Sequence, residues 1–217
     1  MQLVDLTHHF TDGMFGLTTL PPIRVTRLKS LDSHGVNVTH LDCAVHSGTH
    51  LDAPAHFIPG AESIEELSLD RVSGPAIGMA VACGPDHEIT ADELRTADPG
   101  LQPGDILLLR TGWSQYFSTD RETYRRHPWL SHDAAHWLVD QQLKMVAIDV
   151  PSPDRPEHLR PEGFDFPVHH TLLGAGVLIA EHLKDLELVV GRRGRAFAFP
   201  LRIDGSDGSP VRFVVEL

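Results

Sequence analysis

The sequence predicts an α/β domain with a mixed, partly parallel sheet. Residues 106–110 and 145–150 are continuous apolar runs of strand length, as expected for strands that are covered on both faces. Residues 131–142, between them, have the pattern of a capped amphipathic helix. A strand, a helix and a strand in this order form a βαβ unit, whose two strands lie parallel. A length of 217 residues, of which 41% are apolar, suits a single domain over residues 1–217.

The N-terminal part of the chain has strand patterns that are separated by turns. Residues 2–6 form a short apolar pattern, and residues 23–28 alternate like a half-buried strand. Residues 36–46 give the strongest strand pattern, because they alternate and are rich in β-branched side chains. We therefore predict a strand that ends at His46, where a loop begins.

Two details of this region allow two interpretations each. His40 and Asp42 share the parity of His46 along the strand, so they either approach the same site or form a solvated face, which we favour. Met14 and Phe15 lie in a turn-rich segment with few charges. They either border a pocket or fix this loop to the core.

The rest of the chain continues the alternation of helices and strands. The further predicted elements are a helical turn at 63–69, a buried strand at 77–82, a helix that starts at Thr90, a helical turn at 168–173, a buried strand at 177–181 and a closing pair of strands at 195–202 and 210–215. Residues 151–168 are rich in proline and charge. A long irregular connection of this kind is usually functional, often as a lid.

Composition argues against several classes of function. The formal net charge is −12, from 30 acidic and 18 basic residues, which repels phosphate backbones and disfavours nucleic acid as a partner. The sequence has no apolar run long enough to span a membrane, and its start lacks the pattern of a signal peptide. Cys43 and Cys83 are far apart and form no CxxC pair, which favours reduced core thiols and a cytoplasmic location.

One short stretch carries ligand chemistry. His46, His50, Asp52 and His56 follow one another at even spacings, and imidazole and carboxylate are ligands of zinc and manganese. A helix would turn Asp52 away from the two preceding histidines, whereas an extended or looping chain lets all four side chains converge. We predict a strand that ends in a loop around a divalent metal. The alternative is a histidine-rich surface loop, in a chain that has 15 histidines.

A second candidate ligand lies far along the chain. Glu181 ends the apolar strand predicted at 177–181. A charged residue at the end of a buried strand needs a partner, and a metal is one such partner.

Residues 46–57 resemble the H-x-G-T-H-x-D-x-P-x-H-F signature of the metal-dependent cyclase superfamily, the family of bacterial kynurenine formamidases and isatin hydrolase. Every fixed position of the signature is matched. The resemblance extends to residues 5–7, 104–113, 148–154, 169–181 and 209–212. It implies a compact α/β fold of the swivelling β/β/α kind, usually a homodimer or larger homo-oligomer, that hydrolyses an amide at a centre of one or two divalent metals.

The resemblance also implies roles for individual residues. Carried over by position, His46, His50 and Asp52 would be metal ligands, and His169 and Glu181 would complete a second site.

His56, at the end of the signature, would be the catalytic acid–base residue. His170 competes with His169 for the ligand role, and the family spacing of twelve residues to the glutamate favours His169. Family members often have Met-Pro and Trp-Pro pairs in the substrate-facing loop, whereas this chain has Met14-Phe15-Gly16. This departure leaves the identity of the substrate open.

Two classes of function fit these residues. The first is a metal-dependent hydrolase of a small amide or lactam. Its best representative is an arylformamidase that converts N-formylkynurenine to kynurenine and formate, with isatin-type or other cyclic amide or lactone hydrolysis as the alternative. The second class is a non-catalytic metal-binding protein, which would not need a proton shuttle such as His56. The sequence lacks a Gly-x-Ser-x-Gly elbow, which argues against an acyl-enzyme mechanism.

Overall fold

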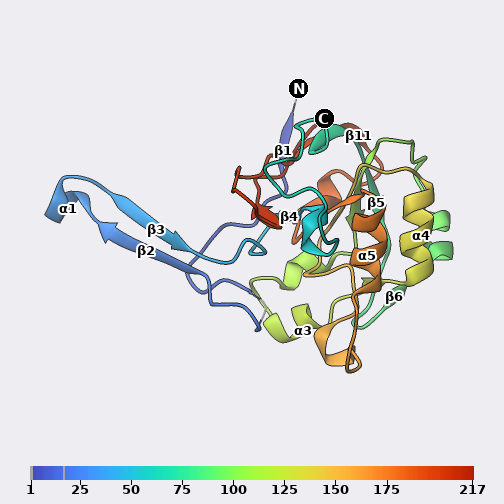
Figure 1. Ribbon diagram of the computed structural model, residues 1–217, viewed down its shortest axis with the longest axis horizontal. Coiled ribbons are helices and arrows are strands. Elements are labelled where there is room, and N and C mark those ends of the chain that lie inside the picture. The colour runs from blue at the N-terminus through green and yellow to red at the C-terminus, as the bar shows by residue number, and fades with distance from the viewer. Residues whose placement is uncertain (1, 17) are drawn as a thin grey trace.

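The computed structural model describes residues 2–16 and 18–217, which form a mixed α/β body with a long projecting hairpin (Figure 1). Within the described residues, one curled sheet has nine strands in the order β1-β13-β11-β5-β7-β9-β10-β4-β12. These strands are β1 (Leu3–Asp5), β4 (His50–Asp52), β5 (Ser73–Ala80), β7 (Ile106–Arg110), β9 (Met145–Ile148), β10 (Leu178–Glu181), β11 (Arg193–Phe197), β12 (Gly208–Pro210) and β13 (Val214–Glu216). The central strands β5, β7, β9 and β10 are parallel, and the pairings outside them are antiparallel.

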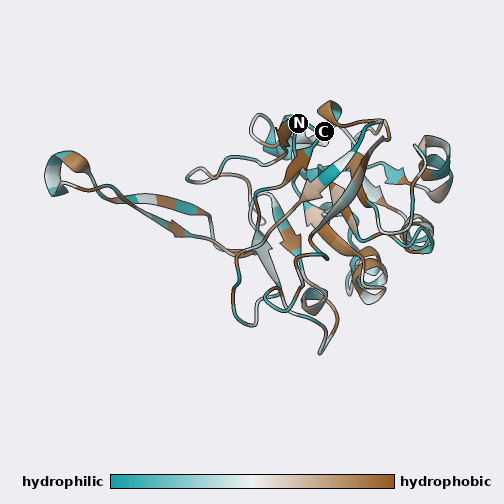
Figure 2. Ribbon diagram, turned by 90° about the horizontal axis from the view of Figure 1, so that it is seen from above, coloured by the Kyte–Doolittle hydropathy of each residue, from teal (hydrophilic) through white to brown (hydrophobic). Residues whose placement is uncertain are grey.

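Helices pack against one face of this sheet. The helices of the body are α2 (Ala91–Ala97), α3 (Arg121–Arg125), α4 (His132–Asp140) and α5 (Pro167–Gly174). The body also contains the strand pair β6 (Glu88–Ile89) and β8 (Trp129–Leu130). Single 3-10 turns lie at Pro54–His56, Trp113–Tyr116, Glu157–Leu159 and Leu186–Leu188. Alternate side chains of the central strands enter two cores. Leu107 packs with Leu138 and Leu172 of the helices, whereas Leu108 packs with Phe213 in the opposite core. Figure 2 shows this apolar character in the strands of the body.

The predicted βαβ unit is confirmed. β7 and β9 are parallel neighbours, and α4 lies between them in the chain. Ser131 caps α4 by accepting a hydrogen bond from the backbone of Ala134, and Thr90 forms a reciprocal capping box with Glu93 at the start of α2. Each cap satisfies backbone N–H groups that have no partner inside the helix, which explains why the local sequence indicates the helix starts correctly.

The strand predicted at 36–46 is wrong in its extent and its role. The observed strand β3 (Val38–Asp42) ends before His46, which lies in a loop. β3 pairs with β2 (Arg24–Lys29) in a separate hairpin, and its residues are exposed on both faces. The alternation at 23–28 is likewise not that of a half-buried strand, because β2 is almost wholly exposed. The apolar residues of both strands belong to a projecting surface.

Two further expectations are corrected. Residues 63–69 form turns and not a helix, and the Ser63 backbone N–H donates to the Glu66 carboxylate at 2.9 Å, which closes one of these turns. Residues 210–215 do not form one strand. Instead β12 pairs with β4, whereas β13 pairs with β1 and β11, because the chain crosses from one part of the curled sheet to the other between them.

The hairpin of β2, α1 (Leu31–His34) and β3 extends away from the body (Figure 1); we call residues 24–42 the arm. Leu28, Leu31 and Leu41 on the arm are 55%, 61% and 49% exposed. A two-stranded hairpin on its own is only marginally stable in water, so an apolar arm of this kind needs a surface to pack against. His40 and Asp42 are exposed on the arm, which confirms the interpretation as a solvated face.

The turn-rich segment before the arm is fixed to the core. Met14 and Phe15 are buried and pack within the helix-covered core of their own chain. No helix in residues 2–16 and 18–217 is long and apolar enough to cross a membrane. The single-domain boundaries and the swivelling β/β/α classification stay predictions.

We predict that the protein is a homodimer in which the arm contacts a second copy. Replacing Leu28 and Leu41 by glutamate places charges on the arm and should convert the dimer to a monomer, measured as molar mass by multi-angle light scattering at micromolar concentration. Leu69→Glu, at a leucine of the body that is 67% exposed, should leave the mass unchanged. A wild-type monomer under these conditions would contradict the prediction.

Candidate metal centre and active site

Two neighbouring strands direct three polar side chains to one face of the sheet. In β4, His50 and Asp52 point to this face and Leu51 points to the other, where it enters the opposite core. β10 runs antiparallel to β4 with Glu181 directly opposite His50, so the Glu181 side chain lies on the same face. All three polar residues are buried. Sheet register, and not a flexible loop, therefore sets their positions.

His169 joins this group from the first half of α5. Asp154 accepts hydrogen bonds from the backbone N–H groups of Val168 and His169, both at 3.0 Å, and from His169 Nδ1 at 2.6 Å. This arrangement fixes the proton on Nδ1 and leaves Nε2 of His169 directed at Asp52 and Glu181. A carboxylate that holds the far nitrogen of a histidine is the usual support of a metal-ligating imidazole.

Four side chains bring donor atoms together at one buried place. His50 Nε2 lies 3.3 Å from an oxygen of Asp52 and 3.3 Å from an oxygen of Glu181. His169 Nε2 lies 3.3 Å from Glu181 and 3.6 Å from Asp52. Tetrahedral coordination with zinc–ligand bonds of about 2.0–2.1 Å separates neighbouring ligand atoms by about 3.3–3.4 Å. These pairs of donor atoms are therefore spaced like neighbouring ligands of a metal ion. Asp52, His169 and Glu181 form one such group, and His50 and Glu181 form an overlapping group with His182.

Hydrogen bonding and charge also fit a cation at this place. His50 Nε2, Asp52 Oδ2 and Glu181 Oε1 are buried without a well-oriented hydrogen-bond partner. Burial opposes the charged form of His50, but the close carboxylates of Asp52 and Glu181 outweigh it and raise the pKa of His50 to about 10. Two buried carboxylates thus attract positive charge strongly. The set of imidazole and carboxylate donors suits a divalent metal such as zinc or manganese.

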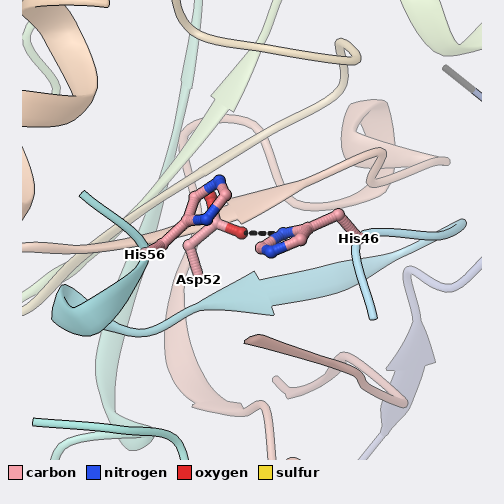
Figure 3. Close-up of side chains that lie close together, drawn as sticks. All are labelled: His46, Asp52 and His56. Carbon is pink, nitrogen blue, oxygen red and sulfur yellow. Dashed lines mark hydrogen bonds and ion pairs between the residues drawn. The ribbon is translucent and has the colours of Figure 1, made fainter. Parts of the chain in front are cut away.

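A second group, formed by His46 and His56, also lies beside Asp52 (Figure 3). His46 Nδ1 is 2.8 Å from Asp52 Oδ1, and His46 Nε2 is 2.8 Å from Asp207 Oδ2. The same oxygen of Asp207 lies 3.0 Å from His56 Nδ1, and the rings of His46 and His56 stack at 3.9 Å. His46, Asp52 and His56 are close enough to hold an ion of their own. Asp52 therefore faces both groups.

Two glycines make these approaches possible. Gly208 follows Asp207, and a Cβ at this position would lie 2.7 Å from the His46 ring and 2.9 Å from the Leu51 carbonyl oxygen. Gly48 has a φ of +59°, a left-handed conformation that other residues rarely adopt. A Cβ at this position would also lie only 3.0 Å from the Met14 side chain. Larger residues would push the ligand-bearing loop and β12 apart.

The structure brings the residues predicted as ligands and His56 together around Asp52. His169 and Glu181 lie beside Asp52, which also contacts His46 and His50. The sheet explains this arrangement, since β10 pairs directly with β4.

The two adjacent histidines of α5, His169 and His170, differ in their position relative to the donor groups. His169 is buried at the centre, whereas His170 is exposed. Sequence reasoning missed Asp154 and Asp207, which orient the histidines. It also missed His182, which is buried beside this centre with Nδ1 at 2.9 Å from the Tyr124 hydroxyl. Asp207 precedes a glycine in what looks like an ordinary turn, so no local pattern indicates its role.

The centre opens into a cavity of about 280 Å³. Its wall includes the four site residues His46, His56, His169 and Glu181, two aromatic rings, Phe57 and Phe166, and part of the 151–168 connection, namely Pro151, Ser152 and Arg160. Burial lowers the pKa of His56, which keeps this imidazole neutral near pH 7. The cavity therefore combines a buried polar centre with an aromatic wall.

Comparisons with known proteins agree with this site. Residues 4–155 match the family described as "Putative cyclase". A kynurenine formamidase of Geobacillus thermodenitrificans (strain NG80-2) is 33% identical over 189 residues, which cover 86% of this chain and 83% of that protein. A solved structure described as a potential metal-dependent hydrolase with cyclase activity has 29% identity and a TM-score of 0.78, covering 99% of this chain and 96% of that one.

The fold extends to isatin hydrolases. Isatin hydrolase A from Ralstonia solanacearum superimposes with a TM-score of 0.86 at 24% identity, covering 99% of this chain and 91% of that one. Fold, buried donor groups and relatives together define a metal-dependent hydrolase. The chain belongs to the cyclase family, kynurenine formamidases are its homologues, and it shares its fold with isatin hydrolases.

We predict that the purified protein contains a divalent metal and that His50 is one of its ligands. His50→Ala should lower metal affinity by more than about 100-fold, because losing a residue that only orients a ligand already costs about 10- to 100-fold. Metal per chain, measured by plasma mass spectrometry after dialysis, checks this. His40→Ala, at an exposed histidine of the arm, is the control and should keep its metal. Full activity in metal-free protein would contradict the prediction.

Proposed function

We propose that the protein is an arylformamidase that hydrolyses N-formylkynurenine, or a closely similar aryl formamide, with one or two divalent metals, zinc or manganese. The relatives named kynurenine formamidase, about 30% identical over most of the chain, support this proposal. The aromatic wall of the cavity, formed by Phe57 and Phe166, suits an aryl substrate. The single observation that carries the proposal is the neutral, oriented imidazole of His56 beside the buried donor groups.

The hydrogen bond to Asp207 determines which nitrogen of His56 can react. His56 Nδ1 donates to Asp207 Oδ2 at 3.0 Å, so Nε2 has no proton and can accept one. Burial keeps the ring neutral by lowering its pKa, as a general base requires. A protein that only stores or binds a metal has no use for such a base. This argues for an enzyme over a non-catalytic metal-binding protein.

The residues that would hold the metal are those of the buried centre: His50, Asp52, His169 and Glu181. His46 and Asp52 would contribute to a second ion. A divalent metal bound there supplies a water of lowered pKa and polarises the substrate carbonyl. The two carboxylates and neutral imidazoles offset its charge, and the sheet keeps them in place when the substrate enters.

The proposed reaction adds water across the formamide bond. His56 Nε2 takes a proton from the attacking water, whose oxygen bonds to the formyl carbon. The bond between this carbon and the aryl nitrogen then breaks, and His56 returns the proton to the departing nitrogen. The products are formate and the free aryl amine, and His56 ends neutral as it began. Phe57 and Phe166 exclude bulk water from this step and hold the aryl ring.

The proposal predicts which substrate is turned over fastest. Metal-loaded protein should release formate from N-formylkynurenine with a higher kcat/KM than it opens isatin or a simple lactone, as expected from the relatives named kynurenine formamidase. Formate release and ring opening, measured side by side on one preparation, check this. If isatin or a lactone is the preferred substrate, the proposed function changes from formamidase to cyclic amide or lactone hydrolase. No turnover of any of them would contradict the proposal.

A substitution at His56 separates catalysis from metal binding. His56→Ala should keep its metal and its fold, but its kcat should fall by about 100- to 10,000-fold, the usual contribution of a positioned acid–base group. Metal per chain and kcat are measured on the same sample. His170→Ala, at an exposed histidine near the same aromatic wall, should stay close to wild type. If His56→Ala lost as much metal as His50→Ala, His56 would be a ligand and not the base.

A further inference from the structure

A second cavity adjoins the one at the metal centre. It has a volume of about 320 Å³ and shares Pro151, Ser152 and Arg160 with the cavity of the metal centre. Its remaining wall includes Phe15, Arg125 and His127. Arg160 therefore lines both cavities, so its guanidinium lies beside a ligand at the metal centre as well as beside this second space.

Two arginines of this cavity have no carboxylate partner. Among residues 2–16 and 18–217, no acidic oxygen lies within 4 Å of the guanidinium of Arg125 or Arg160. Arg160 Nε donates to the Arg155 carbonyl oxygen at 2.7 Å, which holds the side chain. Asp154, Glu157 and Glu181 stabilise its charge from beyond ion-pair distance, so the guanidinium keeps free hydrogen-bond donors. Such a pair of arginines is unexpected in a protein with a net charge of −12, where acidic partners are abundant.

The neighbouring groups that the structure describes form no ion pair with these two arginines. Burial lowers the pKa of His127 to about 4, so this ring is neutral at pH 7. His158 is paired with Asp86 at 2.9 Å. Glu157 is exposed at the cavity edge and accepts a hydrogen bond from the Thr18 hydroxyl. The two arginines therefore present guanidinium groups in this cavity that form no direct ion pair with the described residues.

Aromatic rings connect Arg160 to the metal centre. The guanidinium of Arg160 lies over the Phe166 ring at 4.7 Å, and the Phe166 ring lies 5.3 Å from that of Phe57. Phe57 in turn lies 4.6 Å from the His169 ring. A substrate ring that packs on Phe57 and Phe166 would thus have its scissile amide at one end and Arg160 at the other. Stacking on Phe166 also fixes the plane of the guanidinium, which favours recognition of a planar, two-oxygen group.

We propose that Arg160, supported by Arg125, forms a subsite for a carboxylate carried by the substrate. The preferred substrates are then aryl formamides whose ring carries a side chain that ends in a carboxylate, as in N-formylkynurenine. Arg160 acts on specificity and touches no reacting atom. The inference rests on the proposed function, because that function names the bond that is hydrolysed. The subsite can still be tested separately, by binding alone.

The test compares two substrates that differ only in this charge: formamidobenzoyl-propanoate and its neutral carboxamide. Wild-type protein should prefer the acid by about 10- to 100-fold in kcat/KM for formate release, the range of a charge-assisted bidentate hydrogen bond. Arg160→Gln should reduce this preference to near unity, mainly through a higher KM for the acid. Arg125→Gln should reduce it by a smaller factor. Arg126→Gln, at the neighbouring exposed arginine that pairs with Asp86, should preserve the preference.

Binding of the matching products separates the subsite from the chemistry. Calorimetry with metal-loaded protein should give the aminobenzoyl-propanoate a Kd at least about 10-fold lower than its carboxamide, and Arg160→Gln should remove the difference. Binding of this kind without hydrolysis would keep the subsite and overturn the formamidase function. Hydrolysis with equal kcat/KM for acid and carboxamide would keep the function and overturn the subsite. The subsite would also be overturned if Arg160→Gln still preferred the acid over the carboxamide, or if the protein neither bound the products nor turned over the substrates.

Discussion

The structure depends on one electrostatic constraint: two buried carboxylates, Asp52 and Glu181, lie on adjacent strands of the sheet. Buried carboxylates are costly unless positive charge and hydrogen-bond donors compensate them. Here His50 and His169 provide the donors, and the pKa of each imidazole is raised, with burial opposing the shift and the carboxylates outweighing it. A divalent metal compensates the same charge with shorter contacts. Sheet register, the position of α5 and the path of the connection before it all follow from this requirement.

The constraint also joins distant parts of the chain. The donors come from β4, α5 and β10, and Asp154 and Asp207, which orient them, come from two further loops. Because metal binding to such a set occurs only in the folded state, its free energy also stabilises the fold. Rigid strands therefore carry the ligands, and the loops carry the residues that orient the ligands and recognise the substrate.

The sequence predicts the structure correctly where a residue type is tied to a local geometry. The buried parallel strands, the caps at Ser131 and Thr90, and the convergence of the histidines of residues 46–57 all follow from local pattern and spacing. The arm was misread because an alternating apolar pattern looks the same on a buried sheet face and on a projecting hairpin. Asp207 was missed because its role arises only when β12 pairs with β4, a contact between residues far apart in sequence. The grouping of His50 with Glu181 depends on strand order for the same reason.

The distribution of charge separates metal binding, by Asp52 and Glu181, from substrate recognition, by Arg160. Asp52 and Glu181 need cations, so their imidazoles and metal must stay close to them. Arg160 lies in the shared wall of the two cavities, yet it has no acidic partner and stacks on Phe166. Had Arg160 contacted Glu181 directly, it would have competed with the metal for that carboxylate and would itself have been neutralised. Phe166 packs on the guanidinium of Arg160 and forms no ion pair with it, so the guanidinium keeps hydrogen-bond donors that a substrate group can use.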